Sequence, residues 1–353
     1  MLDPIDTIEV IAPHFKRRLS GVTNSIIQLV PVQKKQGLSI VTIGPGLPKN
    51  LPRISWLSLL KLWKRPLHRP FRIWHARRNN EMIFGLFLRD ICKMPIKVIF
   101  TSATQKKHKK FTKWLLRRMD YVIATSIKGG EYLEVPYRVI MHGINLELFY
   151  PQNKKEKIIA LLPKCYHDKH IIGCFGRVRP SKGTDLFINA MCNLLPHYPD
   201  WNAIVLGNVT RPFIEFEKNL KEKVKEANLE ERILFLGEKK DIANWYNSLT
   251  LYVSPSIEEG FGLTPLEAMA SGVAVVTSGA GAYPQMVNEN TGALAHPINL
   301  KHLITAIEPF LQNPEKTKKL GETAKNFVKS AFPIEKEAAG LKELYENLWQ
   351  GRI

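Results

Sequence analysis

Short, continuous apolar runs recur along this chain, and longer stretches of mixed polar and apolar residues separate them. Six runs lie in the first half and six in the second: residues 8–12, 38–43, 71–76, 98–102, 121–125 and 138–141, then 171–176, 203–207, 233–237, 251–254, 273–277 and 293–295. A run that is apolar at every position predicts a strand buried on both faces of a parallel sheet with helical connections. Two series of such runs predict two doubly wound α/β domains.

A polar stretch at residues 151–157 separates the two series and predicts a domain boundary between residues 150 and 151. The length of 353 residues also favours two domains. Near the C-terminus, residues 333–349 have the spacing of an amphipathic helix. In doubly wound sheets ligands bind at the carboxyl ends of the strands, so we expect the active site in a cleft between the domains.

The net charge of +19 is concentrated in the first half. Residues 1–150 contain 26 Lys and Arg against 9 Asp and Glu, whereas the remainder contains 25 against 23. Such a basic half favours nucleic acid, an anionic membrane surface or an acidic substrate. We expect no nucleic acid, because the chain lacks the patterns of the common nucleic-acid-binding modules. A basic nucleic-acid-binding protein remains the alternative from a different class.

The cysteines and the N-terminus indicate in which cellular compartment the protein functions. Cys92, Cys165, Cys174 and Cys192 form no C-x-x-C pair, so they predict free thiols in a reducing environment and no metal cluster. The first residues lack the features of a signal peptide, and no apolar run approaches the roughly 20 residues that span a bilayer. We therefore expect a cytoplasmic protein, and a peripheral position on the cytoplasmic face of the inner membrane stays open.

Two carboxylates in the second half, Glu259 and Glu267, stand eight positions apart. Thr264 is a candidate helix cap and Pro265 suits a first helical turn, so a helix is predicted to run to the Ser271-Gly272 pair. Glu259 would then lie beside free backbone N–H groups. A carboxylate accepts sugar hydroxyls and a helix start binds anions, which together suit a ligand with hydroxyls and phosphates. The residues that follow Glu259 in this candidate site are Gly260, Phe261, Gly262 and Leu263.

Two cations, Arg177 and Lys182, follow the predicted strand at 171–176 and precede a helical stretch. Because both leave a strand end, they can converge on one anion, and fixed cations stabilise the charge of a departing diphosphate. The order Lys-Gly differs from that of a Walker loop. An exposed basic turn is the alternative interpretation.

Polar residues also follow two predicted strands of the first half. Charge-assisted hydrogen bonds from cations there would suit an acidic acceptor sugar, and a glycine, Gly21, would let the donor approach the backbone closely. A solvated basic loop is the alternative after the first strand, and a structural histidine is the alternative after the third. The residues are Lys16, Arg17, Arg18 and Gly21 after the first strand, and His75, Arg77 and Arg78 after the third.

A third basic segment, residues 106–118, interleaves cations with Phe111, Trp114 and Leu115. On a helix these apolar side chains share one face. That face could lie on an anionic membrane or pack against the domain, and the segment 56–63 leaves the same two alternatives open.

The segment from Glu259 to Glu267 resembles the donor-site signature of the retaining nucleotide-sugar glycosyltransferases of family four. Over most of its length the chain is similar to the lipopolysaccharide core mannosyltransferases of alpha-proteobacteria, through residues 16–23, 74–79, 112–120 and 139–143. The resemblance implies a GT-B fold, with two Rossmann-like doubly wound domains facing a central cleft. It also implies that a helix from about residue 334 to residue 353 packs back on the first domain, and that the second domain, 151–333, binds the nucleotide sugar.

The resemblance further implies a retaining transfer of mannose from GDP-mannose to the acidic Kdo sugar of the lipid-linked inner core, without metal or cofactor. Glu259 would orient the donor sugar, Glu267 the nucleotide, and Arg177 and Lys182 would bind the diphosphate. Glu238 and Lys239 match the loop that holds the base. The chain departs from the family at Arg77, where a histidine is usual, and at Gln285, where a glutamate is usual. A UDP- or ADP-sugar donor, and an epimerase of the same fold, remain alternatives.

Overall fold

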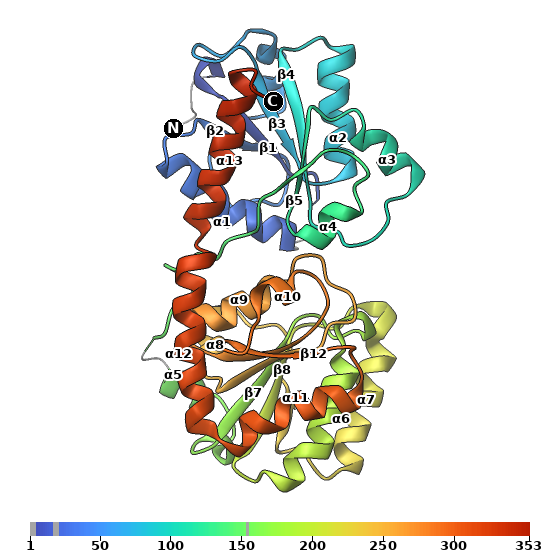
Figure 1. Cartoon of the computed structure of the whole chain (residues 1–353), viewed down its shortest axis with the longest axis vertical. Coiled ribbons are helices and arrows are strands. Elements are labelled where there is room, and N and C mark those ends of the chain that lie inside the picture. Colours follow the sequence, from blue (N-terminus) through green and yellow to red (C-terminus); the bar gives the residue numbers. More distant parts are fainter. Residues whose placement is uncertain (1–4, 17–20, 153–154) are drawn as a thin grey trace. The chain divides into compact units, whose positions relative to one another are not determined.

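The computed structural model describes residues 5–16, 21–152 and 155–353, which form two compact units (Figure 1). The first unit runs to Gly143 and also contains Ile334–Ile353, and the second is Ile144–Pro333. Each unit has a six-stranded sheet whose strands pair in parallel. The prediction of two doubly wound α/β domains is therefore confirmed.

The chain passes from the first unit to the second after Gly143, seven residues before the boundary predicted after residue 150. The backbone N–H of Ile144 donates to the carbonyl of Phe332 at 2.8 Å, and the ring of Phe149 packs against that of Tyr246 at 6.0 Å. Residues 144–150 therefore pack with the second unit. The change of unit therefore lies before the polar stretch at 151–157 rather than within it.

The first sheet has the order β2-β1-β3-β4-β5-β6. Its two faces are both covered, because alternate residues of one strand enter different cores: Val10 contacts the cluster that includes α1 and α13, and Ile11 the cluster that includes α2. The strands are β1 (Val10–Pro13), β2 (Ile40–Ile43), β3 (Arg72–Ala76), β4 (Ile96–Ser102), β5 (Tyr121–Ala124) and β6 (Arg138–Val139). The helices are η1 (Ile5–Thr7), α1 (Gly21–Lys35), η2 (Leu57–Trp63), α2 (Asn79–Leu86), η3 (Phe87–Ile91), α3 (Lys110–Leu116), α4 (Ile127–Glu131) and α13 (Ile334–Trp349).

The second sheet has the order β12-β11-β10-β7-β8-β9. Its strands are β7 (His170–Phe175), β8 (Trp201–Leu206), β9 (Ile233–Phe235), β10 (Leu251–Ser254), β11 (Ala274–Ser278) and β12 (Gly292–Ala295). The helices are α5 (Lys155–Ile159), η4 (Lys164–Tyr166), η5 (Pro180–Lys182), α6 (Thr184–Leu194), η6 (Leu195–His197), η7 (Arg211–Phe213), α7 (Ile214–Glu226), α8 (Ile242–Tyr246), α9 (Leu263–Ala270), α10 (Tyr283–Met286), α11 (Leu300–Gln312) and α12 (Pro314–Ala331).

Each of the twelve predicted apolar runs overlaps one of these strands. The helix after Glu259 also forms, but Thr264 is not its cap. Gly262, with φ of +91°, is the residue before α9, and Thr264 lies inside the first turn together with Pro265. A left-handed glycine turns the chain into the helix two residues earlier than the threonine suggested.

In each sheet the strand that comes first in the chain has neighbours on both sides. β1 lies between β2 and β3, and β7 lies between β8 and β10. Connections therefore leave in opposite directions at these strands, and ligands of doubly wound sheets bind beside such points, at the carboxyl ends of the strands. The loops after β1 and β3, and those after β7 and β10, are the places to look for chemistry.

Buried polar contacts fix α13 on the first unit. The carboxylate of Glu337 accepts from the backbone N–H of Gly143 at 2.8 Å and lies 2.8 Å from Nδ1 of His142. Arg69 donates to both carboxylate oxygens of Glu346, at 2.5 and 2.7 Å. The C-terminal helix thereby completes the first unit. None of the helices in the described ranges is long and apolar enough to cross a membrane.

We expect Glu337→Ala to lower the free energy of unfolding by about 2–4 kcal/mol, because two buried groups lose their shared partner. The control is Glu343→Ala on the same helix, whose carboxylate pairs with Arg138 at the surface and should matter far less. Chemical denaturation measures both variants. Equal effects of the two substitutions would contradict the role given to Glu337.

Candidate active site

Two loops of the second unit, those after β7 and β10, are joined by backbone contacts. The carbonyl of Ser181 accepts from the N–H groups of Ile257 and Glu258, both at 3.1 Å. Gly183, with φ of +65°, lies against Pro255, and a Cβ on it would stand 2.1 Å from the Pro255 carbonyl oxygen. Only glycine fits there. The close approach brings the cations of the first loop to the carboxylate of the second.

Glu259 is the centre of this arrangement. Its carboxylate forms an ion pair with Lys182, and the same oxygen lies 3.3 Å from the hydroxyl of Tyr283 and 3.5 Å from that of Ser256. The other oxygen accepts from the N–H of Gly260 at 3.2 Å. These hydrogen bonds hold an ionised acceptor in one orientation, which is what recognition of sugar hydroxyls requires.

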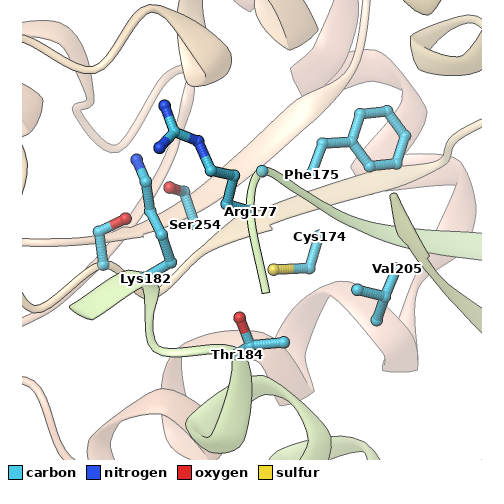
Figure 2. A pocket seen from close by; sticks show the side chains of 9 residues that line it. Cys174, Phe175, Arg177, Lys182, Thr184, Val205 and Ser254 are labelled. Carbon is cyan, nitrogen blue, oxygen red and sulfur yellow. The ribbon is translucent and has the colours of Figure 1, made fainter. Parts of the chain in front are cut away.

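A pocket lies at the carboxyl end of β7, and both predicted cations line it. Figure 2 shows Arg177 and Lys182 pointing to the same side of this pocket, with Ser254 beside them. Two positive groups that converge in this way favour a dianion such as a diphosphate. The residues that line the pocket are Cys174, Phe175, Gly176, Arg177, Lys182, Thr184, Val205, Ser254 and Ser256.

The glycine-containing loops around Glu259 are close-packed. A Cβ on Gly262 would stand 2.2 Å from the ring of Tyr283, and one on Gly281 would stand 3.1 Å from Glu259. The carbonyl of Phe261, a buried residue, accepts from Ala282 at 3.1 Å. The glycine-containing loop at 278–285 therefore packs against the segment that carries Glu259.

Two remaining donor-side predictions fall close to this centre. Gly260 binds the Glu259 carboxylate through its N–H, and Leu263 is the first residue of α9. Gln285, the departure from the family, lies in α10, and its Oε1 is buried without a hydrogen-bond partner among the described residues.

Glu267, the second carboxylate of the motif, lies on α9. Its Oε2 accepts from the hydroxyl of Tyr246 at 2.9 Å. Burial raises the pKa of Glu267 to about 7, and the hydrogen bond from Tyr246 opposes that rise. The carboxyl group therefore titrates in the neutral range, and a ligand that donates a hydroxyl to it would favour the ionised form.

We expect the affinity for an intact nucleotide sugar to rise up to roughly tenfold between about pH 6 and about pH 8. The raised pKa leaves Glu267 largely protonated below 7 and ionised above it, and only the carboxylate accepts two hydroxyls. Isothermal titration calorimetry measures the affinity and the accompanying proton release. Glu267→Gln should bind weakly at both pH values. A pH profile identical in the wild type and this variant would assign the titration to another group.

The loops after β8 and β9 are also joined. The side chain of Asn208 donates to the carboxylate of Glu238 at 2.6 Å and accepts from its N–H at 3.2 Å. Glu238 and Lys239 are exposed, and the ammonium group of Lys239 stands 5.7 Å from the ring centroid of Trp245. This loop lies at the carboxyl end of the same sheet as Arg177, and its contact with a base stays a prediction.

In the first unit, the loop after β3 is less open than the sequence suggested. Arg78 donates to Nδ1 of His14 at 2.7 Å and to the buried carboxylate of Glu81 at 3.1 Å. Arg77 is buried, and its N–H donates to Glu81 at 2.8 Å. Burial and the nearby Arg78 lower the pKa of His14 to about 4, so its neutral ring accepts from the guanidinium. These side chains therefore hydrogen-bond to one another within the unit.

His75 has a structural role in this unit, which corrects its assignment to the acceptor. Its side chain is buried, with Nδ1 2.6 Å from the hydroxyl of Tyr345 and Nε2 2.6 Å from that of Thr101. Both ring nitrogens are therefore engaged, one of them by α13. Burial lowers the pKa of His75 well below its ordinary value, so the ring is neutral.

Lys16 is exposed after β1, and Gly21 is the first residue of α1. Apart from its chain neighbours and its own helix backbone, no atom of the described residues lies within 4 Å of a Cβ placed on Gly21, so they leave space beside its backbone. Arg17 and Arg18 lie outside the described residues. Lys16 and Gly21 are thus the described residues of this loop that a ligand could reach.

The apolar residues of the segment 106–118 do not share one face as predicted, because Leu115 is buried whereas Phe111 and Trp114 are exposed. The helix in this segment is only α3, which buries Leu115 and Leu116 in the core. Phe111 and Trp114 remain exposed and stack on each other at 5.9 Å, with the guanidinium of Arg118 over the Trp114 ring at 4.3 Å. The helix therefore docks on the sheet and presents a small aromatic face outward.

The sequence did not reveal the hydroxyl groups of Tyr283 and Tyr246 that contact the two carboxylates. Tyr283 could have been found, since it directly follows the glycine-rich loop. Tyr246 has no local signal, because it lies 21 positions from Glu267 on another helix. The described residues contain no group of three His, Cys, Asp or Glu side chains placed to hold a metal ion.

Comparison with known proteins identifies the family to which this chain belongs. The family model of the glycosyl transferases group 1 matches residues 157–327. The chain is 51% identical to the lipopolysaccharide core biosynthesis mannosyltransferase LpcC of Rhizobium leguminosarum bv. viciae, with 98% of this chain and 97% of the relative covered. It is 48% identical to the corresponding enzyme LpsB of Rhizobium meliloti (strain 1021), over 98% and 99% of the two chains.

Among solved structures, HepE of Anabaena in complex with UDP and glucose superimposes with a TM-score of 0.80 over 96% of this chain and 100% of that chain. At 18% identity this likeness shows the fold alone, which is GT-B. The protein is a glycosyltransferase with two Rossmann-like units. It belongs to the glycosyl transferases group 1 family, in the branch of the lipopolysaccharide core mannosyltransferases.

Proposed function

We propose that this enzyme transfers mannose from GDP-mannose, with retention, to a Kdo residue of the lipopolysaccharide inner core. The observation that carries the donor half is the convergence of Arg177, Lys182 and Glu259 at the carboxyl ends of β7 and β10. The hexose and the pathway are supported by the names of the relatives, which are lipopolysaccharide core biosynthesis mannosyltransferases over nearly the full chain.

In this proposal, binding of the donor breaks the ion pair between Lys182 and Glu259, and each side chain binds part of the donor instead. The diphosphate takes Lys182 from Glu259 and binds Arg177 as well, while the released Glu259 carboxylate accepts hydroxyls of the hexose. As the glycosidic bond breaks, negative charge grows on the leaving phosphate, and the two cations stabilise it. Attack and departure share one face of the sugar, and the leaving phosphate takes the proton of the acceptor hydroxyl. No cofactor beyond the donor takes part.

The acceptor is an acidic sugar on a lipid, and the basic first unit supports its capture. Lys16 follows β1 beside the point where the sheet connections diverge, and Arg17 and Arg18 come next in the sequence. A lipid-linked acceptor also places the enzyme at the cytoplasmic face of an anionic membrane. The excess of 26 cations over 9 carboxylates in residues 1–150 supports contact with both.

The test is a matrix of donors and acceptors. GDP-mannose with a water-soluble Kdo acceptor is expected to give a mannosylated product, detected by mass spectrometry, with the anomeric configuration kept in the NMR spectrum. UDP- and ADP-sugars should give little product. Turnover of the nucleotide sugar without any acceptor would support the epimerase alternative, and RNA binding without sugar-nucleotide binding would support the nucleic-acid alternative.

A further inference from the structure

The first unit presents a row of exposed apolar side chains along η2. In a 3₁₀ helix, side chains three positions apart eclipse one another, so Leu57, Leu60 and Trp63 form one row. Their exposed fractions are 79%, 64% and 48%, whereas Leu59 and Leu62 of the same helix are buried in the core. The buried side chains therefore anchor the helix in the core, and the other row of side chains is exposed to solvent.

A second apolar row runs beside it along α2 and η3. Ile83, Phe87 and Ile91 are spaced by four residues, which places them on one helical face, and they are 44%, 47% and 71% exposed. The two rows meet through ring and backbone contacts. Trp56 packs against Phe84 at 5.8 Å, and Phe84 packs against Phe87 at 6.2 Å.

At the other end of the two rows, Nε1 of Trp63 donates to the carbonyl of Cys92 at 2.6 Å, directly after Ile91. The two rows therefore form one continuous surface, which we call the η2–η3 surface. Its apolar residues are Trp56, Leu57, Leu60, Trp63, Ile83, Phe87 and Ile91.

The charge around this surface has one sign. Exposed cations accompany both rows, and none of them forms an ion pair with a residue in the described ranges: Arg53, Lys61, Lys64, Arg65 and Lys93. No Asp or Glu occurs between Glu9 and Glu81. Within residues 53–93 the carboxylates are Glu81, which is buried, and Asp90, which pairs with Arg89 at 2.8 Å.

We propose that the η2–η3 surface docks this enzyme on the headgroup region of an anionic lipid bilayer, with its leucine and aromatic side chains entering the acyl boundary. Leucine and tryptophan side chains flanked by lysine and arginine match that interface in both hydrophobicity and charge. A second copy of the chain fits poorly, because a symmetric contact would bring five unpaired cations against five more. This inference rests on the proposed function in one respect, namely that the acceptor is a lipid-linked sugar anchored in the same bilayer.

The test compares exposed leucines of two units. Leu57→Ser with Leu60→Ser should weaken sedimentation with vesicles of equal parts phosphatidylglycerol and phosphatidylcholine by roughly tenfold or more. The matched control is Leu161→Ser, which replaces a 70% exposed leucine of the second unit and should leave binding intact. Lys61→Gln with Lys64→Gln should weaken binding at low salt and have less effect at high salt.

The exposed aromatic pair of α3, Phe111 and Trp114, is the alternative surface through which the protein could bind vesicles. Phe111→Ser with Trp114→Ser is expected to keep most of the binding, since that face has only two apolar side chains. Tryptophan fluorescence gives an independent readout. The blue shift on vesicle addition should be lost in Trp56→Phe with Trp63→Phe and retained in Trp114→Phe.

Transfer to a water-soluble acceptor separates this inference from the proposed function. The Leu57 and Leu60 variants should keep normal turnover with that acceptor and lose it with acceptor in vesicles. If the wild type fails to mannosylate the soluble acceptor while vesicle binding behaves as described, the transfer reaction is wrong and the surface stands. Undiminished vesicle binding by these variants, a loss that follows Phe111 and Trp114 instead, or a wild-type dimer that the leucine variants dissociate would overturn the inference.

Discussion

Glu259→Gln is expected to lower the transfer rate by roughly 100-fold or more while the protein stays folded. The substitution keeps the shape of the side chain and removes the charge that pairs with Lys182 and accepts from Tyr283 and Gly260. An amide cannot serve as a two-oxygen acceptor for the hydroxyls of the donor sugar. Initial rates at saturating donor, with circular dichroism to check the fold, measure the effect.

The control for Glu259 is the adjacent carboxylate. Glu258→Gln removes the same charge one position earlier, at an exposed side chain, and should leave the rate within a few-fold of the wild type. Near-normal turnover in a variant that combines Glu259→Gln with Glu267→Gln would refute the assignment of both carboxylates.

Lys182→Ala is expected to produce a loss of similar size, roughly 100-fold in rate or more, because one of two fixed cations that line the pocket is removed. The effect should fall more on kcat than on the affinity for the donor, since the charge on the leaving diphosphate is largest in the transition state. Arg177→Ala should behave in the same way. The control is Lys169→Ala, which removes an exposed cation of the same unit that pairs with Asp200.

The ion pair also predicts that the two losses are coupled. A double variant, Lys182→Ala with Glu259→Ala, should be much less damaged than the product of the single effects, because each single variant already breaks the same contact. If Lys182→Ala leaves both nucleotide affinity and turnover intact, the loop at 176–183 is a surface turn and the diphosphate binds elsewhere.

The sequence alone determined the two sheets and located the candidate site around Glu259. A strand buried on both faces of a parallel sheet must be apolar throughout, and this requirement leaves a continuous run that local pattern analysis detects. The motif from Glu259 to Glu267 was visible for a similar reason, since its carboxylates, glycines and helix start lie within nine positions.

Contacts between distant segments were decided by the tertiary structure alone. Lys182 and Glu259 are 77 positions apart, and their pairing depends on how Gly183 packs against Pro255. Arg77 and Arg78 appeared free in the sequence, yet Glu81 accepts from the guanidinium of Arg78 and from the backbone N–H of Arg77. Glu81 is buried because α2 packs on the sheet.

His75 and η2 illustrate the same limit. A histidine at the end of a strand has the same local sequence whether it faces a ligand or a helix that arrives 270 positions later, as Tyr345 of α13 does. In η2, the leucines at 57, 59, 60 and 62 are chemically identical, and only the placement of the helix against the core separates the buried from the exposed. Side-chain chemistry and local spacing are written in the sequence, whereas burial and long-range pairing depend on which distant segments the fold brings together.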